Sequence, residues 1–516
     1  MRLRTSLSLL PLLTAGLVAL PTVSVPTAAA QTPVPVAPEV QELRVDGIDA
    51  AVLARSPEPE DEHVDAEAGD VHDDLTPVAV SQEAGVGGFS AVGVTWLPDP
   101  DLEEVAVQVR TRAGDRWRAW TDVEVQLGTG SDPASREAQD ARTGSDLLFV
   151  GPSDAVQVRV DSAGGTPRDL RLSLVDPGVS RADAASTDGT SAARPVLLGG
   201  GVAQAALSVP EHVSRAGWGA DESLRSCTSP STQALRGGIL HTTATSNDYT
   251  AEQSPAVVRA MYAYHTRSLK WCDLGYNFLV DKFGTLYEGR AGSVTRHVIG
   301  SHTGGFNTGT VGVSMIGHHD LVAPTAAQLR TVERVFAWKL GGAGLDPQGT
   351  TTYASGGGSA TRYASGTVVE KPVISGHRDY STKSCPGDLA YPLLGDIRAA
   401  VAAMVGHDRS SAVSFRAVPP PLVTRDVTIG IRQAAGTYTF SGRVSPAEAG
   451  VQVTTARLDG VTNRVTGVAS TRTDAAGRYT IRTRLPAGFA GYYSLSGPTS
   501  GIGAGRSRLY GLVVPR

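Results

Sequence analysis

Residues 373–388 read VISGHRDYSTKSCPGD, and this stretch decides how we interpret the chain. A short apolar strand leads into a turn-rich loop that carries His377, Lys383 and Cys385 within nine residues. Loops that a regular scaffold holds in place let side chains converge on one point. Imidazole and thiolate are ligands that suit Zn²⁺, so the loop indicates a metal site with an ammonium group beside it.

A third ligand has to come from another part of the chain. The best candidate is His241, which ends a second short strand over 238–241 and is followed by polar residues. Two histidines and one cysteine fill three of four tetrahedral positions and leave the fourth for water, as in a catalytic zinc site. Taken singly, a histidine on a strand is more often a hydrogen-bonded core residue, and a cysteine is more often a small buried hydrophobe.

Further sequence blocks accompany these residues between about 213 and 403. They read SRAGWGA at 214–220, HTTA at 241–244, WCDLGYNFLV at 271–280, YEGR at 287–290, GSHTGGFN at 300–307 and VGVS at 311–314. In this order, and with the loop at 377–388, the segment resembles the peptidoglycan recognition protein family. That family shares its fold with the phage-lysozyme type of N-acetylmuramoyl-L-alanine amidase. The resemblance covers roughly 190 of the 516 residues.

The resemblance implies a catalytic centre. It couples His241, His377 and Cys385 as zinc ligands, and zinc lowers the pKa of a bound water to about 7 and polarises a scissile carbonyl. It implies two catalytic residues, Tyr276 pointing at that water and Lys383 beside the developing oxyanion. Phage enzymes carry lysine at the second position, whereas many other members carry threonine. The alternatives are core packing for the tyrosine and solvent exposure for the lysine.

The resemblance also implies a substrate groove, where amides and a guanidinium would meet the carboxylates and N-acetyl oxygens of a muropeptide. Members that prefer meso-diaminopimelate commonly have a tryptophan soon after the Glu-Gly-Arg block, whereas Ala-Gly follows here. The residues expected in the groove are Asn277, Arg290, His302 and Asn307.

The three cysteines of an exported chain divide into a pair and a single thiol. Because Cys385 belongs to the metal loop, Cys227 and Cys272 are left to form a disulfide, which an oxidising compartment favours. The alternative is two free buried thiols. Four other histidines show no partner pattern and are expected to be structural or on the surface: His265, His297, His318 and His319.

The first thirty residues have the pattern of a signal peptide. Arg2 and Arg4 precede an apolar run from Leu7 to Leu20, and three alanines end at Ala30. The run is shorter than the roughly 18 to 20 residues that cross a membrane. We therefore expect cleavage near Ala30 and a secreted or wall-associated protein with no stable membrane anchor.

The rest of the chain is too long for one core, and its composition changes along its length. Residues 31–87 are rich in Pro, Ala and acid, which is typical of a flexible segment, although a weak cation site at His63 and His72 is an alternative. Over 88–176, apolar and polar residues alternate, which predicts an antiparallel β-sandwich-like domain. We expect its tryptophans, Trp96, Trp117 and Trp120, to pack in the core, and a sugar-stacking face is the alternative.

A Ser-, Ala- and Gly-rich linker over 177–209 leads to the amidase-like domain at 210–404, and a second linker, 405–424, contains three consecutive prolines. The final part, 425–516, predicts short strands with tight turns and resembles small immunoglobulin-like modules, which we assign to spacing or wall attachment. The fold class is therefore multidomain, with a central α/β domain between an N-terminal β-sandwich-like domain and a C-terminal immunoglobulin-like β domain.

Within 210–404, five short apolar strands alternate with two helices, which predicts a mixed sheet with helices on its faces. Ser254 as N-cap and Pro255 at the first position predict the start of one helix, and a capping box of Thr325 and Gln328 predicts the other. The Gly-, Ser- and Thr-rich stretch 341–369 is expected to be a surface loop.

These patterns favour a secreted zinc amidase that cleaves the bond between N-acetylmuramic acid and L-alanine in peptidoglycan. With 46 basic and 51 acidic residues, the chain gives no general case for nucleic acid or an anionic membrane as partner. We expect a monomer whose flanking domains contact cell-wall polymers. One alternative is a non-catalytic recognition protein on the same fold. Another is a wall scaffold or adhesin with a structural zinc, for which His302 is the only nearby fourth ligand.

Overall fold

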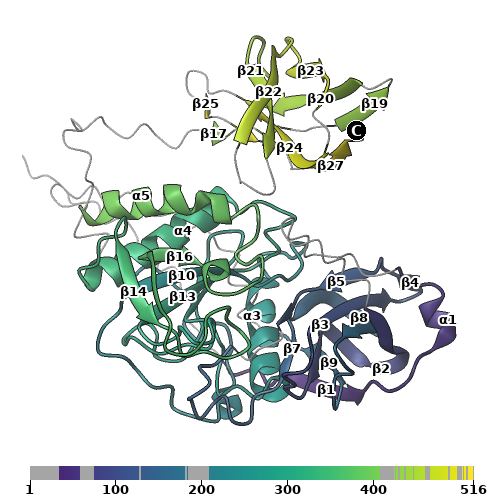
Figure 1. Cartoon of the computed structure of the whole chain (residues 1–516), viewed down its shortest axis with the longest axis vertical. Coiled ribbons are helices and arrows are strands. Elements are labelled where there is room, and N and C mark those ends of the chain that lie inside the picture. Colours follow the sequence, from purple (N-terminus) through teal and green to yellow (C-terminus); the bar gives the residue numbers. More distant parts are fainter. Residues whose placement is uncertain are drawn as a thin grey trace, which may run out of the picture.

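The computed structural model describes residues 34–57, 75–126, 130–180, 183 and 208–406, and most of 423–514 in shorter stretches. Three parts follow one another along the chain: a β domain, an α/β domain and a second β domain (Figure 1). The predicted signal peptide, the acidic run at 58–74 and most of both predicted linkers lie outside the described residues. None of the helices in the described part has the length and apolar character that a membrane crossing needs.

The first domain is an antiparallel sheet of nine strands. Its main path runs β1-β9-β2-β8-β3-β4, and side chains that alternate along β2, β3, β8 and β9 enclose a core of valines and leucines around Trp96. The bounds are β1 Glu39–Arg44, α1 Ala50–Leu53, β2 Thr76–Trp96, β3 Glu104–Ala113, β4 Arg116–Trp117, β5 Thr121–Val123, β6 Val125–Gln126, β7 Thr143–Ser145, β8 Leu148–Ala163 and β9 Arg171–Asp176.

The predicted β domain is present, but it begins well before residue 88. Strand β1 and the first half of β2 lie in the stretch expected to be flexible, and β1 pairs with β9 in the register Glu39↔Asp176. A partner so far along the chain cannot be read from local composition. Trp96 lies in the core as expected, whereas Trp117 and Trp120 are half-buried beside the Arg110 guanidinium, 5.2 and 5.0 Å from their ring centroids.

The second domain is built on a mixed sheet of five strands in the order β12-β11-β13-β10-β16, with only β12 antiparallel to its neighbour. Helices α4 and α5 cover one face, where Val335, Phe336 and Ile397 pack on Leu240 and Val313. The bounds are β10 Gly237–Thr242, α3 Ser254–Ala263, β11 Phe278–Val280, β12 Leu286–Glu288, β13 Thr310–Met315, α4 Ala326–Phe336, β14 Thr350–Ala354, β15 Val368–Pro372, β16 Ile374–Gly376 and α5 Leu394–Val405.

Both predicted helices form, each with a π-helical last turn, and the mixed sheet is confirmed. Thr325 caps α4 by accepting a hydrogen bond from the Gln328 N–H at 3.1 Å, but the Gln328 amide donates to strand carbonyls instead of completing the box. The N-cap of α3 is Gln253 and not Ser254. The stretch expected to be a surface loop contains β14 and the first two residues of β15, and these two strands form an antiparallel hairpin that buries Tyr353.

The first two domains share one apolar core. Helix α3 lies between the second domain's sheet and the first domain (Figure 1). Its Met261 and the following Tyr264 belong to the same buried cluster as Leu147 and Phe149 of the first domain. The Tyr264 hydroxyl is 3.2 and 2.9 Å from the carbonyl oxygens of Val94 and Ser145. Burial of this kind gives the interface the character of a protein interior.

The C-terminal part consists of short strands around a small core of Tyr438, Phe440, Val453, Tyr479 and Ile481. Strands form where alternation predicted them, and the turn before β23 is closed by Asp474, which accepts from the Arg478 N–H at 2.9 Å. The bounds are β17 Val423–Thr424, β18 Asp426–Val427, β19 Gly430–Ala434, β20 Thr437–Ser445, β21 Gln452–Leu458, β22 Val465–Arg472, β23 Arg478–Thr483, β24 Gly488–Ser496, β25 Ile502–Gly503, β26 Gly505–Arg506 and β27 Tyr510–Val514.

Candidate functional site

Strand β10 presents His241 on the face of the sheet opposite to α4. Side chains alternate along a strand, so Gly238 and Leu240 face α4 while Ile239 and His241 face the other way. Gly238 is required by this packing, because a Cβ there would lie 2.4 Å from the Phe336 ring. His241 is the second-last residue of β10, at the end of the strand where the loops that follow neighbouring strands meet.

Strand β16 brings the second histidine to the same place. It runs parallel to β10 with Leu240 opposite Gly376, so His377 follows directly beside His241, with the ring centroids 4.7 Å apart. The loop then folds back, because the Arg378 N–H donates to the Cys385 carbonyl at 2.7 Å. The ligand atoms of His241, His377 and Cys385 all lie within 4.8 Å of one another, and all three residues are buried.

The chemistry of this cluster suits a cation that binds neutral imidazoles and a thiolate. Burial lowers the pKa of His377 to about 4. Burial and the neighbouring His377 together hold the pKa of His241 well below its ordinary value. Both rings are then neutral at physiological pH. The His377 Nδ1 atom is buried with no hydrogen-bond partner in the described part of the chain, as a vacant ligand atom would be. Burial raises the pKa of the Cys385 thiol, which a bound cation would reverse.

Tyr276 and His302 lie against His241. Their ring centroids are 5.3 and 5.0 Å from that of His241, and His302 Nδ1 is 3.1 Å from His241 Nε2. Gly312 allows this approach, since a Cβ there would lie 2.5 Å from the His302 ring. Burial is the main reason that the pKa of Tyr276 is raised well above its usual range, so its hydroxyl stays protonated and can donate. Lys383 is half-buried in the loop between His377 and Cys385.

The expected groove residues are all buried, and their contacts differ. Asn307 and Arg290 are bonded to the first domain, as described below. The Asn277 amide is bonded inside its own domain: it donates to Ser293 Oγ and the Val298 carbonyl and accepts from the Gly312 N–H. Its role in the groove stays a prediction.

The predicted disulfide between Cys227 and Cys272 is formed, with the Cα atoms 5.3 Å apart, and Cys385 is the remaining buried thiol. Of the histidines expected to be structural, His265 is buried, and its Nδ1 accepts from the Gly275 N–H at 3.1 Å.

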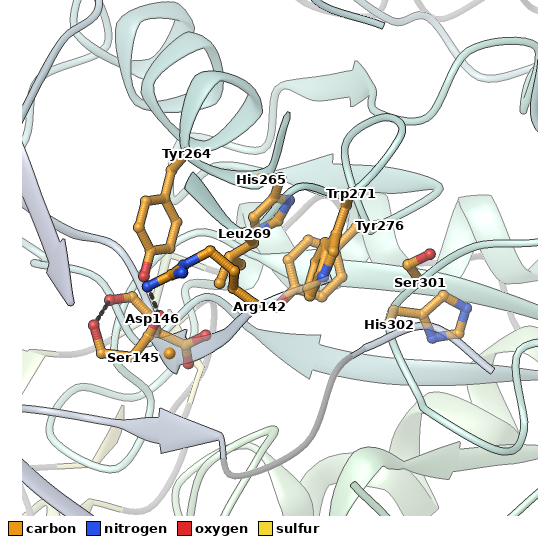
Figure 2. Close-up of a pocket in the computed structure, with 11 residues that line it drawn as sticks. Arg142, Ser145, Asp146, Tyr264, His265, Leu269, Trp271, Tyr276, Ser301 and His302 are labelled. Carbon is orange, nitrogen blue, oxygen red and sulfur yellow. Dashed lines mark hydrogen bonds between the residues drawn. The ribbon is translucent and has the colours of Figure 1, made fainter. Parts of the chain in front are cut away.

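Residues of the first domain complete the surroundings of the site, and sequence reasoning missed them. Figure 2 shows a small pocket that is lined by Arg142, Ser145 and Asp146 of the first domain together with Tyr276 and His302 of the second. The local sequence holds no signal for this contact, because the two segments are separated by more than a hundred residues and were read as different domains.

Comparisons with known proteins separate the first domain from the second, as the structure does. Residues 38–193 match the family described as Rv3811 N-terminal galactose-binding domain-like, and residues 231–388 match the N-acetylmuramoyl-L-alanine amidase family. The first match includes β1 and β2, in agreement with the early start of the first domain.

Individual relatives match the second domain. Peptidoglycan-recognition protein SC2 of Drosophila simulans is 30% identical over 187 residues, which are 36% of this chain and 84% of the relative. The chain belongs to the peptidoglycan recognition protein family. Peptidoglycan recognition protein 1 of Bos indicus is 31% identical over 199 residues, 38% of this chain and 88% of the relative. The human N-acetylmuramoyl-L-alanine amidase is 33% identical over 139 residues, 27% of this chain and 20% of that protein. This peptidoglycan recognition protein thus has relatives named as recognition proteins and relatives named as amidases.

Proposed function

We propose that the protein is a secreted, zinc-dependent N-acetylmuramoyl-L-alanine amidase that hydrolyses the amide between N-acetylmuramic acid and L-alanine in peptidoglycan. The observation that carries the proposal is the group of two imidazoles and one thiol within 4.8 Å, which holds every ligand that the amidase reading requires. Relatives named as N-acetylmuramoyl-L-alanine amidases support the choice of reaction. A signal-peptide pattern in the first thirty residues supports export.

In this mechanism His241, His377 and Cys385 hold the metal. When bound, zinc supplies a water of lowered pKa and polarises the scissile carbonyl. Tyr276, kept protonated by its buried position, donates a hydrogen bond that orients the attacking oxygen. Lys383 stabilises the negative charge that develops on the carbonyl oxygen, an effect worth roughly 10²- to 10³-fold in rate. The muropeptide is bound by the four groove residues Asn277, Arg290, His302 and Asn307.

A structural zinc is less well supported than a catalytic one. A closed structural site has four protein ligands. His302 touches His241, but it does not belong to the group of donors within 4.8 Å, and the described residues offer no other member. A purely recognising role is favoured by the relatives named as recognition proteins, and it predicts binding without hydrolysis.

The test is mass analysis of the products released from purified sacculi by the zinc-loaded protein. The amidase reading expects free stem peptides that begin with L-alanine, and Cys385→Ala should release none. If the wild-type protein binds sacculi and releases no such peptides, the recognition reading replaces the amidase reading.

A further inference from the structure

A segment of the first domain lies across the groove expected to bind substrate. This covering segment, residues 130–140, has no regular secondary structure and is partly exposed on its outer side. Its two inward-facing acids, Asp132 and Glu137, are half-buried against the second domain. Ser131 Oγ lies 3.2 Å from Ser301 Oγ, so the start of the segment is also in direct contact with the groove.

Asp132 is bound by a nest of donors at the end of the GSHTGGFN block. Its Oδ1 accepts from the Gly305 N–H at 2.9 Å, from the Asn307 N–H at 3.2 Å and from the Asn307 side-chain amide at 2.9 Å. That amide also donates to the Gly130 carbonyl at 2.8 Å. Backbone and amide N–H groups that converge in this way form a binding site for an anion, and here a carboxylate of the same chain occupies it.

Glu137 occupies a second set of donors. Its Oε1 accepts from the Arg290 guanidinium at 2.5 Å and from the Cys272 N–H at 2.9 Å, and its Oε2 accepts from Ser301 Oγ at 2.7 Å. The guanidinium is 1% exposed, so the ion pair is well shielded from water. The two carboxylates therefore engage, between them, two of the residues from which the groove was expected to bind the acidic groups of a muropeptide.

Residues that follow the covering segment lie beside the candidate metal centre. His241, His377 and Cys385 are at most 5% exposed, and Tyr276 is 7% exposed. The side nearest Tyr276 and His302 is lined by Arg142 and Asp146 of the first domain (Figure 2).

We infer that the covering segment is an intramolecular substrate mimic, in which Asp132 and Glu137 stand in for the carboxylates of a stem peptide and keep the enzyme latent. The inference rests on the proposed function for the identity of the competing ligand. If the site is open in only a fraction of the molecules, the apparent dissociation constant of its ligand is the intrinsic constant divided by that fraction. Removing the two carboxylates should therefore tighten muropeptide binding without changing the chemical step.

The experiment uses the full chain and a soluble muramyl tripeptide as the probe. Asp132→Ala combined with Glu137→Ala should lower the dissociation constant and KM at least tenfold, with kcat at saturation unchanged. Asp132→Ala alone should give part of the effect, and it avoids leaving the Arg290 charge without a partner if the double variant folds poorly. The matched control is Asp154→Ala, which removes an acid that pairs with Arg112 on the same domain away from the groove.

Two further measurements report closure without relying on catalysis. Hydrogen exchange at the Gly305 and Asn307 amides should speed up in Asp132→Ala, since both donate to the removed carboxylate. In the double variant Ser131→Cys with Ser301→Cys, a thiol oxidant such as diamide should convert the two thiols into a disulfide that locks the segment and abolishes tripeptide binding. Reduction with dithiothreitol should restore the binding that the same variant shows before oxidation.

The outcomes separate this inference from the proposed function. If binding tightens and no variant hydrolyses the probe, the amidase proposal fails and the mimic stands. If exchange at Gly305 and Asn307 is unchanged, or if exchange speeds up while binding weakens or stays the same, the mimic is overturned and the segment is either absent from the groove in solution or part of the substrate site.

Discussion

Protonation of His265 should make the second domain sensitive to acid, and the size of the effect follows from its position. The ring is buried, accepts from the Gly275 N–H at 3.1 Å and packs 4.5 Å from the Trp271 ring. Burial, followed by the charge of Arg290, lowers the pKa of His265 to about 3. An unfolded histidine has a pKa of about 6.5, so the unfolded chain binds more protons below that pH and stability falls as the pH falls.

Between pH 7 and pH 4.5 this histidine alone should remove about 2 to 3 kcal/mol from the free energy of unfolding. The assay is urea unfolding followed by tryptophan fluorescence at both pH values, with a chelator present so that loss of metal at low pH does not contribute. The other buried histidines titrate equally in wild type and variant and cancel in the comparison. His265→Gln cannot take up the proton, and its side-chain oxygen can still accept from Gly275. Comparing the variant with wild type at pH 7 gives the packing cost, and the change in that difference at pH 4.5 isolates protonation.

The reasoning is refuted if wild type and His265→Gln lose the same free energy between the two pH values. That result would mean that the ring is accessible to protons in the folded protein, contrary to its position beneath Trp271.

Three other predictions concern the metal, the disulfide and a helix cap. Elemental analysis should find about one zinc per chain in the wild type and in Lys383→Ala, and none in Cys385→Ala; zinc retained by Cys385→Ala would contradict the ligand set. The turnover of Lys383→Ala should fall by roughly 10²-fold with substrate binding intact. Replacing Cys227 and Cys272 by alanine should cost about 3 to 4 kcal/mol in chemical denaturation, as expected for a closed loop of 45 residues, and an unchanged midpoint would reject this. Thr325→Ala should cost about 1 kcal/mol by removing the cap of α4, whereas Thr325→Ser should cost much less.

The sequence predicted those features that depend on neighbours in the chain. Short apolar runs located the strand that carries His241 and the strand that precedes His377, and a threonine followed three residues later by glutamine located the start of α4. Both signals are local, because an apolar run and a cap's hydrogen bond involve residues only a few positions apart.

Features that depend on distant partners could not be read in this way. The hydrogen bonds of Asn277 go to residues 16 to 35 positions away, so its partners inside the domain could not be predicted from neighbouring sequence. No local pattern singles out Asp132 or Glu137, because their donors lie more than 130 positions further along the chain. A β domain and an α/β domain each have a recognisable pattern, but the surface on which they meet has none.

The apolar seam between the first two domains bears on how such a protein can be inherited. Tyr264 and Phe149 are buried only because both domains are present in one chain. A recombination event that joined either domain to a different neighbour would expose these rings to water and promote aggregation. Relatives that match the second domain over most of their length show that this fold also occurs without the first domain, so the expectation concerns this chain. Its first two domains should stay together, and shuffling should occur at the boundary with the C-terminal part, whose small core among the described residues contains only its own side chains.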